Sequence, residues 1–272
     1  MSSRDAERWR IKPGTKVRLD SIDPGSTDGA PGDKKKTEAT FPSLDDKLYG
    51  LQERLYAEHQ QSLLVVLQAM DTAGKDGTIK HVFGGLNAVG VRVAAFKAPT
   101  EDELAHDFLW RIHSRTPGQG EVGVFNRSHY EDVLVVRVHE LAPTTVWQAR
   151  YGHINSFERV VQEKGTRIVK LYLHISKEEQ AQRLQARLDD PTKHWKFNPG
   201  DLEERKLWDD YMKAFEDAIA ETTTDDAPWY VIPANRKWYR NWAVSRILIE
   251  TLEEMNPQYP KPTFDPSTIV VT

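Results

Sequence analysis

The stretch that decides the fold reads Gln68-Ala69-Met70-Asp71-Thr72-Ala73-Gly74-Lys75-Asp76-Gly77-Thr78. It follows Ser62–Leu67, a continuous apolar run typical of a buried parallel strand, and a helix is predicted to begin near Thr78. A glycine-rich turn between a strand and a helix aims backbone N–H groups at an anion, and the helix dipole adds about half a positive charge. Lys75 adds a full charge that can follow a phosphoryl group. The stretch therefore predicts a phosphate-binding loop.

The loop departs from the general pattern G-x-x-x-x-G-K-[ST] at two positions. Ala69 replaces the first glycine, and Asp76 replaces the Ser or Thr that binds the metal. Carboxylates on both sides of Lys75 make sense if one of them holds Mg²⁺, which bridges carboxylates and phosphate oxygens. We assign that role to Asp71; the alternative is an ordinary turn with a surface lysine. The predicted phosphate-binding residues of the loop are Ala73, Gly74, Lys75, Asp76, Gly77 and Thr78.

Strand-like and helix-like segments alternate on both sides of the loop. Four more apolar runs are predicted strands: Val91–Phe96, Glu121–Phe125, Arg167–Ile175 and Trp229–Pro233. Helical patterns cover Asp45–Gln60, Thr145–Lys164 and Ser176–Asp190, and another helix begins at Asp201. This alternation predicts one α/β domain, a mostly parallel sheet covered by helices on both faces.

Local signals support these helix boundaries. Thr100-x-x-Glu103 and Ser176-x-x-Glu179 are capping-box patterns that follow predicted strands. Gly165 is a plausible C-cap for the helix that precedes it.

Composition limits the class of protein. The 272 residues are 39% hydrophobic and 29% charged, which is typical of a globular protein of the cytoplasm. The polar start of the chain has no apolar signal-peptide core, and no run approaches a membrane span. Cysteine is absent, so thiolate chemistry is excluded. The net charge of −4 argues against a general nucleic-acid binder, so positive charge for an anionic substrate has to be gathered by the fold.

Residues 1–42 differ from the rest of the chain. They are rich in Gly, Pro, Ser, Asp and Lys, and they include the run Lys34–Lys36. We predict an extended N-terminal arm or a partly disordered tail, followed by a catalytic domain over residues 43–272. The lysine run is interpreted as a solvated segment, with contact to a phosphate chain or a partner subunit as the alternative.

The third predicted strand runs into Asn126-Arg127-Ser128-His129-Tyr130-Glu131-Asp132. Ligands of open α/β sheets bind beyond the carboxyl ends of the strands, which places Arg127 near Lys75. Arg127 can clamp a phosphate with two hydrogen bonds. Asp132 or Glu131 can complete a magnesium site. We interpret His129 as a structural hydrogen-bonding residue, with a general base as the alternative; the bland interpretation of the whole segment is a helix cap with incidental charges.

Arg183 and Arg187 lie four residues apart on one helix and therefore share a face. A basic, aromatic hinge with Lys193, Trp195 and Lys196 joins this helix to the next. Two such helices can form a lid that brings arginines to a phosphoryl group and excludes water. Residues 176–206 hold equal numbers of basic and acidic residues, so a solvated helical hairpin is the alternative.

Taken together, Gln68–Thr78, Phe125–Leu134 and Trp229–Asn235 resemble the polyphosphate kinase 2 family over roughly residues 40–260. The chain is most similar to the short, single-domain branch often called class III. The two departures in the loop agree with this family's variant.

The resemblance implies a three-layer, P-loop kinase-like α/β/α fold with five parallel strands and a helical lid at about residues 183–206. It implies Mg²⁺-dependent, in-line transfer of the terminal phosphoryl group of inorganic polyphosphate to AMP and to ADP, so that ATP can be formed. Mn²⁺ is the alternative metal. By motif position, Asp71 and Asp132 bind the metal, Lys75 and Arg127 bind the transferring phosphate, and Arg183 and Arg187 come from the lid.

Further expectations concern binding partners. Long polyphosphate needs an extended basic groove, for which the candidates are Lys80, His81, Arg111, Arg115, Lys193 and Lys196. We expect a homo-oligomer, a dimer or tetramer, that binds neither nucleic acid nor membranes. Most of the tryptophans, among them Trp195, Trp229, Trp238 and Trp242, are expected in the core or an interface. Two other functions stay open: an ATP-dependent nucleoside monophosphate kinase, and a non-catalytic phosphate- or nucleotide-sensing module.

Overall fold

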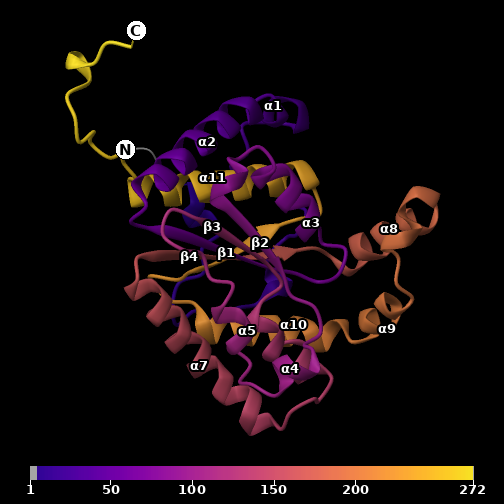
Figure 1. Cartoon of the computed structure of the whole chain (residues 1–272). Coiled ribbons are helices and arrows are strands. Elements are labelled where there is room, and N and C mark those ends of the chain that lie inside the picture. The colour runs from indigo at the N-terminus through magenta and orange to yellow at the C-terminus, as the bar shows by residue number, and fades with distance from the viewer. Residues whose placement is uncertain (1–4, 272) are drawn as a thin grey trace.

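The protein is described by a computed structural model that covers residues 5–271. At its centre lies a sheet of five parallel strands in the order β2-β3-β1-β4-β5 (Figure 1). The strands are β1 (Ser62–Gln68), β2 (Val91–Ala95), β3 (Val122–Asn126), β4 (Thr166–His174) and β5 (Trp229–Pro233). The predicted α/β fold with a five-stranded parallel sheet is confirmed.

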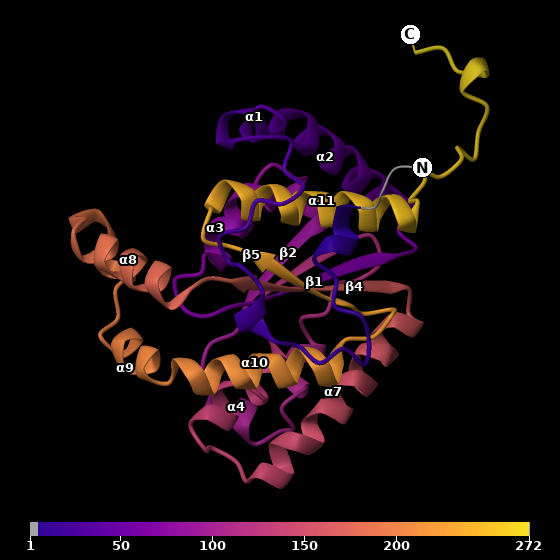
Figure 2. The same ribbon diagram turned by 180° about the vertical axis from the view of Figure 1, so that it is seen from behind.

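Helices cover both faces of the sheet (Figures 1 and 2). On one face lie α2 (Phe41–Glu58), α3 (Lys75–Thr78) and α11 (Lys237–Met255), and on the other lie α7 (Thr144–Glu163) and α10 (Trp208–Thr222). The shorter helices are α1 (Lys34–Glu38), α4 (Glu101–Leu104), α5 (Trp110–His113), α6 (Val135–Val138), α8 (Lys177–Leu188) and α9 (Gly200–Lys206). In the described part of the chain, no helix combines the length and the apolar character that crossing a membrane requires.

Burial explains why β1 is a continuous apolar run. Every residue of β1 is buried, and Val65 pairs with Val124 of β3 on one side and Val169 of β4 on the other. A strand between two covering layers has no solvent face, so its side chains do not alternate in polarity. Because β1 and β3 are parallel, their carboxyl ends lie at the same edge of the sheet, where the loop and the Asn126–Asp132 turn meet.

The capping signals are borne out with one difference. Thr100 and Glu103 form both bonds of a capping box. Ser176 accepts from the backbone N–H of Glu179, but the Glu179 carboxylate pairs with Arg183 at 2.7 Å instead of closing the box. Gly165 has φ +86°, the left-handed conformation that lets the chain leave α7 and enter β4.

The N-terminal arm, predicted to be extended and partly disordered, packs against the domain over its described residues. Trp9 and Leu19 are buried in the core. Around Arg10 the arm pairs antiparallel with the edge of β5: Ile11 N–H donates to Trp229, and Val231 N–H donates to Trp9, both at 2.8 Å. The arm thereby covers a strand edge that would otherwise expose unpaired backbone groups.

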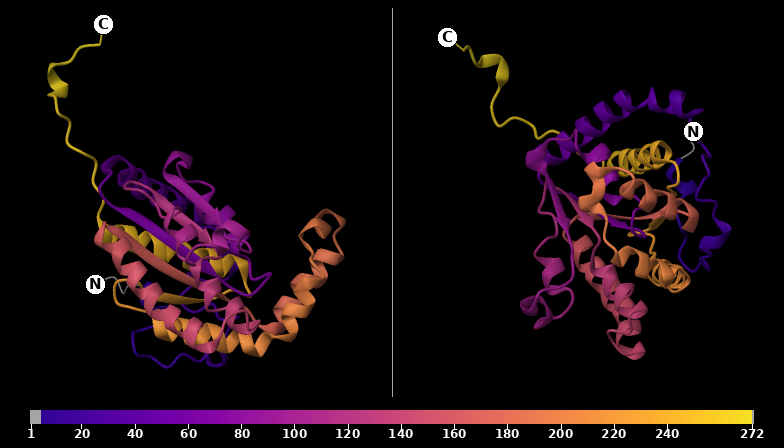
Figure 3. Two further views of the ribbon diagram at one scale, coloured as in Figure 1. Left: turned by 60° about the horizontal axis from the view of Figure 1, so that its bottom comes forward. Right: turned by 90° about the vertical axis from the view of Figure 1, so that its right-hand side faces the viewer.

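Helices α8 and α9, with the 3₁₀ turn Pro191–Lys196 between them, project beside the carboxyl ends of the strands (Figure 3). This is the segment that the sequence predicts as a lid. At its turn Trp195 is 79% exposed, unlike the buried Trp229 and Trp242. Its two basic neighbours, Lys193 and Lys196, are also exposed, so a ligand can reach them.

Candidate active site

The loop after β1 wraps around its own lysine. Lys75 Nζ donates to the carbonyl of Ala69 at 2.9 Å, so the residue in place of the first glycine serves through its backbone. Gly74 has φ +109°, and a Cβ there would overlap Arg240, so only glycine fits. Thr72 has φ +65°, a strained conformation for a β-branched residue of the kind that clusters at functional sites.

Two polar contacts join the loop to the end of β3. Arg127 Nη2 donates to Asp71 Oδ1 at 2.8 Å, and Asn126 Nδ2 donates to Asp76 Oδ1 at 2.7 Å. The parallel pairing of β1 with β3 places these residues side by side at the carboxyl edge. The loop and the Asn126–Asp132 turn therefore form one site, as the sequence predicts.

A cavity of about 620 Å³ opens above the loop, between it, the ends of β2 and β3, and helix α8. Nine basic side chains and two carboxylates, Asp71 and Asp76, line it. The basic residues are Lys75, Lys97, Arg127, Arg183, Arg187, Lys193, Lys196, Lys237 and Arg240. The fold thus gathers in one place the positive charge that the acidic composition concealed.

A second cavity of about 260 Å³ lies on the other side of the Asp71–Arg127 pair, which lines both cavities. Its charge is the opposite, because Asp71, Glu131, Asp201 and Glu204 face a single cation, Arg127. Apolar and aromatic side chains complete its wall: Ala69, Met70, Leu134, Val135, Tyr211 and Phe215.

The pKa shifts follow from burial among like and unlike charges. Burial lowers the pKa of Lys75, while Asp71 opposes the shift. Burial also raises the pKa of Glu131, against the pull of Arg127 and Lys75. At the other wall, burial and the neighbouring Arg183 lower the pKa of Arg240 to about 10. An anionic ligand in this cavity would favour the charged forms of Lys75 and Arg240.

Several predicted residues line the cationic cavity: Gly74, Lys75, Asp76, Gly77, Asp71, Arg127, Arg187, Lys193 and Lys196. Ala73 and Thr78 have other contacts. The Ala73 carbonyl accepts from Arg183 and Arg240, and the buried Thr78 hydroxyl donates to the Gly74 carbonyl. The Ala73 N–H donates to the Met70 carbonyl at 3.2 Å, so phosphate binding by Ala73 stays a prediction that these contacts do not support.

Arg183 lines the cavity, but its guanidinium is already engaged. Its Nε donates to Glu179, Nη1 to the carbonyls of Thr72 and Ala73, and Nη2 to those of Ala234 and Asn235. In this conformation Arg183 ties helix α8 to the loop and to the end of β5. Arg187 is more open: its Nη1 donates to the Lys196 carbonyl at 2.8 Å and lies 3.4 Å from Asp201.

The second predicted metal ligand, Asp132, does not join Asp71. Its Oδ1 accepts from Arg150 at 3.0 Å, and it lines neither of the two cavities. Burial raises its pKa to about 6. Glu131 lies beside Asp71 instead, because the 3₁₀ turn at His129–Asp132 points consecutive side chains in different directions. Asp132 as a metal ligand stays a prediction that this geometry does not support.

Lys80 and His81 also lie outside the cavity. His81 packs edge-on against Phe41 with ring centroids 4.7 Å apart, on the outer side of the helical segment that follows the loop. Arg111 is held by Glu103 and by the carbonyl of Lys97. Lys80 and His81 lie beyond the first turn of the helical segment that begins at Lys75. Only that first turn faces the edge of the sheet from which the helix starts.

Three basic residues of the cavity are not among those predicted from the sequence. Lys97 directly follows β2, and Lys237 and Arg240 begin α11 after β5. The rule that ligands bind beyond the carboxyl ends of strands, which identified Arg127, could have found all three. Tyr211 and Phe215 come from the first half of α10, and no local pattern marks them.

The carboxylates at the junction suit a magnesium ion. Within residues 5–271, no three acidic or imidazole groups form a cage for a metal. Magnesium does not require one, because it usually binds through one or two carboxylates, substrate phosphates and water. Asp71 contributes one oxygen to Arg127 and keeps its second for such a ligand, with Glu131 next to it.

Comparisons with known proteins agree on one family. The family described as Polyphosphate kinase 2 (PPK2) matches residues 32–260. The chain is 56% identical to the AMP/ADP-polyphosphate phosphotransferase of Meiothermus ruber, over 97% of this chain and 99% of that one. It is 43% identical to the ADP-polyphosphate phosphotransferase of Rhodopseudomonas palustris, over 94% and 93%. The crystal structure of polyphosphate kinase 2 from Arthrobacter aurescens TC1 has a TM-score of 0.94 at 48% identity, covering 98% of this chain and 95% of that one.

Proposed function

Because the chain belongs to the polyphosphate kinase 2 family, we propose that it transfers the terminal phosphoryl group of inorganic polyphosphate to AMP and to ADP. The observation that carries this proposal is a pair of oppositely charged cavities that meet at Asp71 and Arg127. The cationic cavity suits a polyanion and the acidic cavity does not. Polyphosphate and the nucleotide can therefore approach Asp71 and Arg127 from different sides.

The cationic cavity is the donor side of the proposal. A phosphate chain carries negative charge along its whole length and needs many cations rather than one pocket. The nine basic side chains come from the loop, the ends of β2 and β3, α8 with its following turn, and α11. Lys193 and Lys196 extend the charge to the rim, where the chain can leave the site.

The smaller cavity is the acceptor side. Its four carboxylates repel polyphosphate, while Tyr211, Phe215 and Leu134 offer an apolar surface to a nucleoside. Asp201 and Glu204 can accept hydrogen bonds from ribose hydroxyls or an exocyclic amine. The nucleotide's phosphate then reaches Arg127, the one basic residue that lines both cavities.

The attacking group is already an anionic phosphate oxygen, so no residue has to remove a proton. Catalysis then consists of positioning and charge stabilisation. Lys75 follows the transferring phosphoryl group from the loop, and Arg127 clamps it from the β3 side. A bound Mg²⁺, or Mn²⁺, would be held by Asp71 and Glu131 and would neutralise phosphate charge. The projecting helices α8 and α9 close over the site and exclude water.

One assay tests the proposal against its rivals. The purified chain is mixed with Mg²⁺, AMP and polyphosphate in the absence of ATP, and nucleotides are separated by chromatography. The expected result is ADP first and ATP later. Product formed only when ATP is the donor indicates a nucleoside monophosphate kinase. No product from either donor with AMP or ADP defeats the catalytic proposal and leaves a sensing module.

A further inference from the structure

The turn Asn126–Asp132 has two faces. Arg127 and Glu131 point to the site, where both line the acidic cavity. His129 and Tyr130 point the other way and are fully buried. The proposed chemistry uses the first pair and leaves the second without a role.

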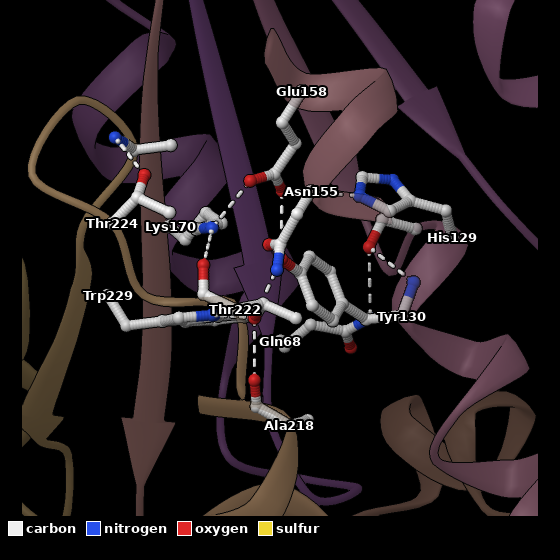
Figure 4. Close-up of polar contacts among 12 residues, drawn as sticks. Gln68, His129, Tyr130, Asn155, Glu158, Lys170, Ala218, Thr222, Thr224 and Trp229 are labelled. Carbon is white, nitrogen blue, oxygen red and sulfur yellow. Dashed lines mark hydrogen bonds and ion pairs between the residues drawn. The ribbon is translucent and has the colours of Figure 1, made fainter. Parts of the chain in front are cut away.

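The buried pair meets an ion pair inside the domain (Figure 4). Glu158 of α7 and Lys170 of β4 lie 2.6 Å apart, and both are buried. Tyr130 Oη donates to Glu158 Oε1 at 2.8 Å, and His129 Nε2 lies 3.4 Å from the same oxygen. Lys170 also donates to the carbonyl of Thr222 at 2.7 Å.

The two charges of this pair depend on each other, because burial lowers the pKa of Lys170 and Glu158 opposes that shift. Burial opposes the charge of Glu158, but Lys170 and His129 hold the pKa of Glu158 below its usual value. The rings of Tyr130 and Trp229 lie 5.7 and 5.6 Å from Lys170 Nζ, close enough for cation–π attraction. Burial lowers the pKa of His129, which favours the neutral form of its ring.

A buried ion pair is a poor way to stabilise a core, because well-packed apolar residues often do as well or better. What an ion pair adds is geometry, since hydrogen bonds fix the positions of the groups that they join. Here they join α7, β4 and the end of α10 to the back of the turn that carries Arg127.

The turn needs such a constraint. Arg127 has φ +61°, a conformation that costs free energy for a residue with a side chain. Strained backbone persists only where the surrounding structure fixes it. Arg127 itself has one anchor to the sheet, from its N–H to the Leu67 carbonyl at 3.1 Å. The next anchor is Ser128, whose hydroxyl accepts from Tyr130 N–H and from Gln68.

We propose that the Glu158–Lys170 pair, acting through the Tyr130 hydroxyl, is a positioning element that holds Arg127 and Glu131 in their productive arrangement. This inference rests on the proposed function. A shift of about 1 Å in a catalytic group can cost about a hundredfold in rate. The pair therefore acts on the rate of transfer rather than on the affinity for either substrate.

The first test is Tyr130→Phe, which keeps the ring and removes the hydroxyl with its contacts to Glu158 at 2.8 Å and to the Thr222 hydroxyl at 3.0 Å. The matched control is Thr166→Val, which removes the buried 2.8 Å hydroxyl contact between Thr166 and Ser62 in the first pair of the β1–β4 register, away from the loop. We expect kcat for ATP formation from ADP and polyphosphate to fall at least tenfold in Tyr130→Phe and less than twofold in the control. Both KM values should change less than threefold, and the two variants should have similar Tm.

The second test separates position from stability. In Glu158→Leu with Lys170→Met, both charges are replaced by apolar groups, so the fold is retained while the bond to Tyr130 is lost. A Tm near that of the wild type, together with a kcat at least tenfold lower, is the expected result. Wild-type kcat in this double variant, or in Tyr130→Phe, overturns the inference. Absence of product from the wild-type chain in the same assay is a failure of the proposed function instead.

Discussion

Lys75 is the single residue on which the proposed transfer depends most. Its Nζ donates to the Ala69 carbonyl inside the loop, and no other basic side chain of the described residues contacts that carbonyl. We expect Lys75→Ala to lower kcat about 10²–10³-fold, as the loss of a preorganised donor does. The measurement is ATP formation from ADP and polyphosphate at saturation. Lys213→Ala on the exposed surface of α10 is the control, and near-wild-type activity of Lys75→Ala would show that the loop is assigned wrongly.

The metal ligands are a second question at this scale. Glu131→Gln and Asp132→Asn remove one charge each from adjacent positions of the same turn. Because Glu131 lies beside Asp71 and Asp132 contacts Arg150, we expect Glu131→Gln to raise the Mg²⁺ concentration needed for half-maximal rate at least fivefold. Asp132→Asn should leave that concentration within twofold of the wild type. The reverse order of the two Mg²⁺ titrations would restore Asp132 as the ligand.

These two residues show how far a sequence determines a site. The strand-end rule located the turn after β3 and hence Arg127, because a parallel sheet brings all its carboxyl ends to one edge. It could not choose between Glu131 and Asp132, since the direction of each side chain depends on the 3₁₀ geometry of the turn. Arg183 lines the cationic cavity, but its bonds to four backbone carbonyls depend on loops far away in the sequence.

Among the elements, helices α8 and α9 form the projecting segment that the sequence predicts as a lid. Their closing over the site stays a prediction. Its turn carries Lys193 and Lys196 into the rim of the cationic cavity. The five strands were predicted to within about one residue, and the signal is clearest in β1 and β5, whose residues are all buried. Their order in the sheet depends on long-range pairing, which no local pattern encodes.

Replacing both rim lysines should weaken polyphosphate binding selectively. We expect Lys193→Ala with Lys196→Ala to raise KM for polyphosphate about threefold to tenfold, the effect of losing two exposed charge contacts. KM for ADP should stay within twofold, and the effect should shrink at high salt because exposed charges are screened. Lys206→Ala with Lys213→Ala removes equal charge outside the cavity and should change neither constant. An equal rise in both KM values would argue against a donor-side role.

For the molecule as a whole, the N-terminal arm is part of the core. Trp9 is 5% exposed, its Nε1 donates to Tyr239 Oη at 3.2 Å, and its ring packs edge-on against Trp242. We expect Trp9→Ala to lower the free energy of unfolding by about 3–5 kcal/mol, measured by urea denaturation. Trp195→Ala, at a 79% exposed position, should change it by less than about 0.5 kcal/mol. Similar values for both variants would mean that the arm does not pack as described.

The arm also makes stability depend on pH. His174 Nε2 lies 3.1 Å from the Ile22 carbonyl, and burial lowers the pKa of His174. Below its usual pKa of about 6.5 the unfolded chain binds a proton that the folded chain excludes, so stability is lost as pH falls. We expect the wild type to lose up to about 1.4 kcal/mol per pH unit more than His174→Gln between pH 6.5 and the lowered pKa. Parallel pH profiles of the two unfolding free energies would refute this.

Of the described residues, Asp71 and Arg127 are the two that line both cavities. A molecule that joins a nucleoside covalently to a short phosphate chain could therefore occupy both at once. Linking two weak ligands makes the second binding event intramolecular, and the gain can reach about 10²–10⁴-fold. Dinucleotide-like or adenosine-capped oligophosphates of graded length would act as molecular rulers, and the length that inhibits best would measure the path between donor and acceptor.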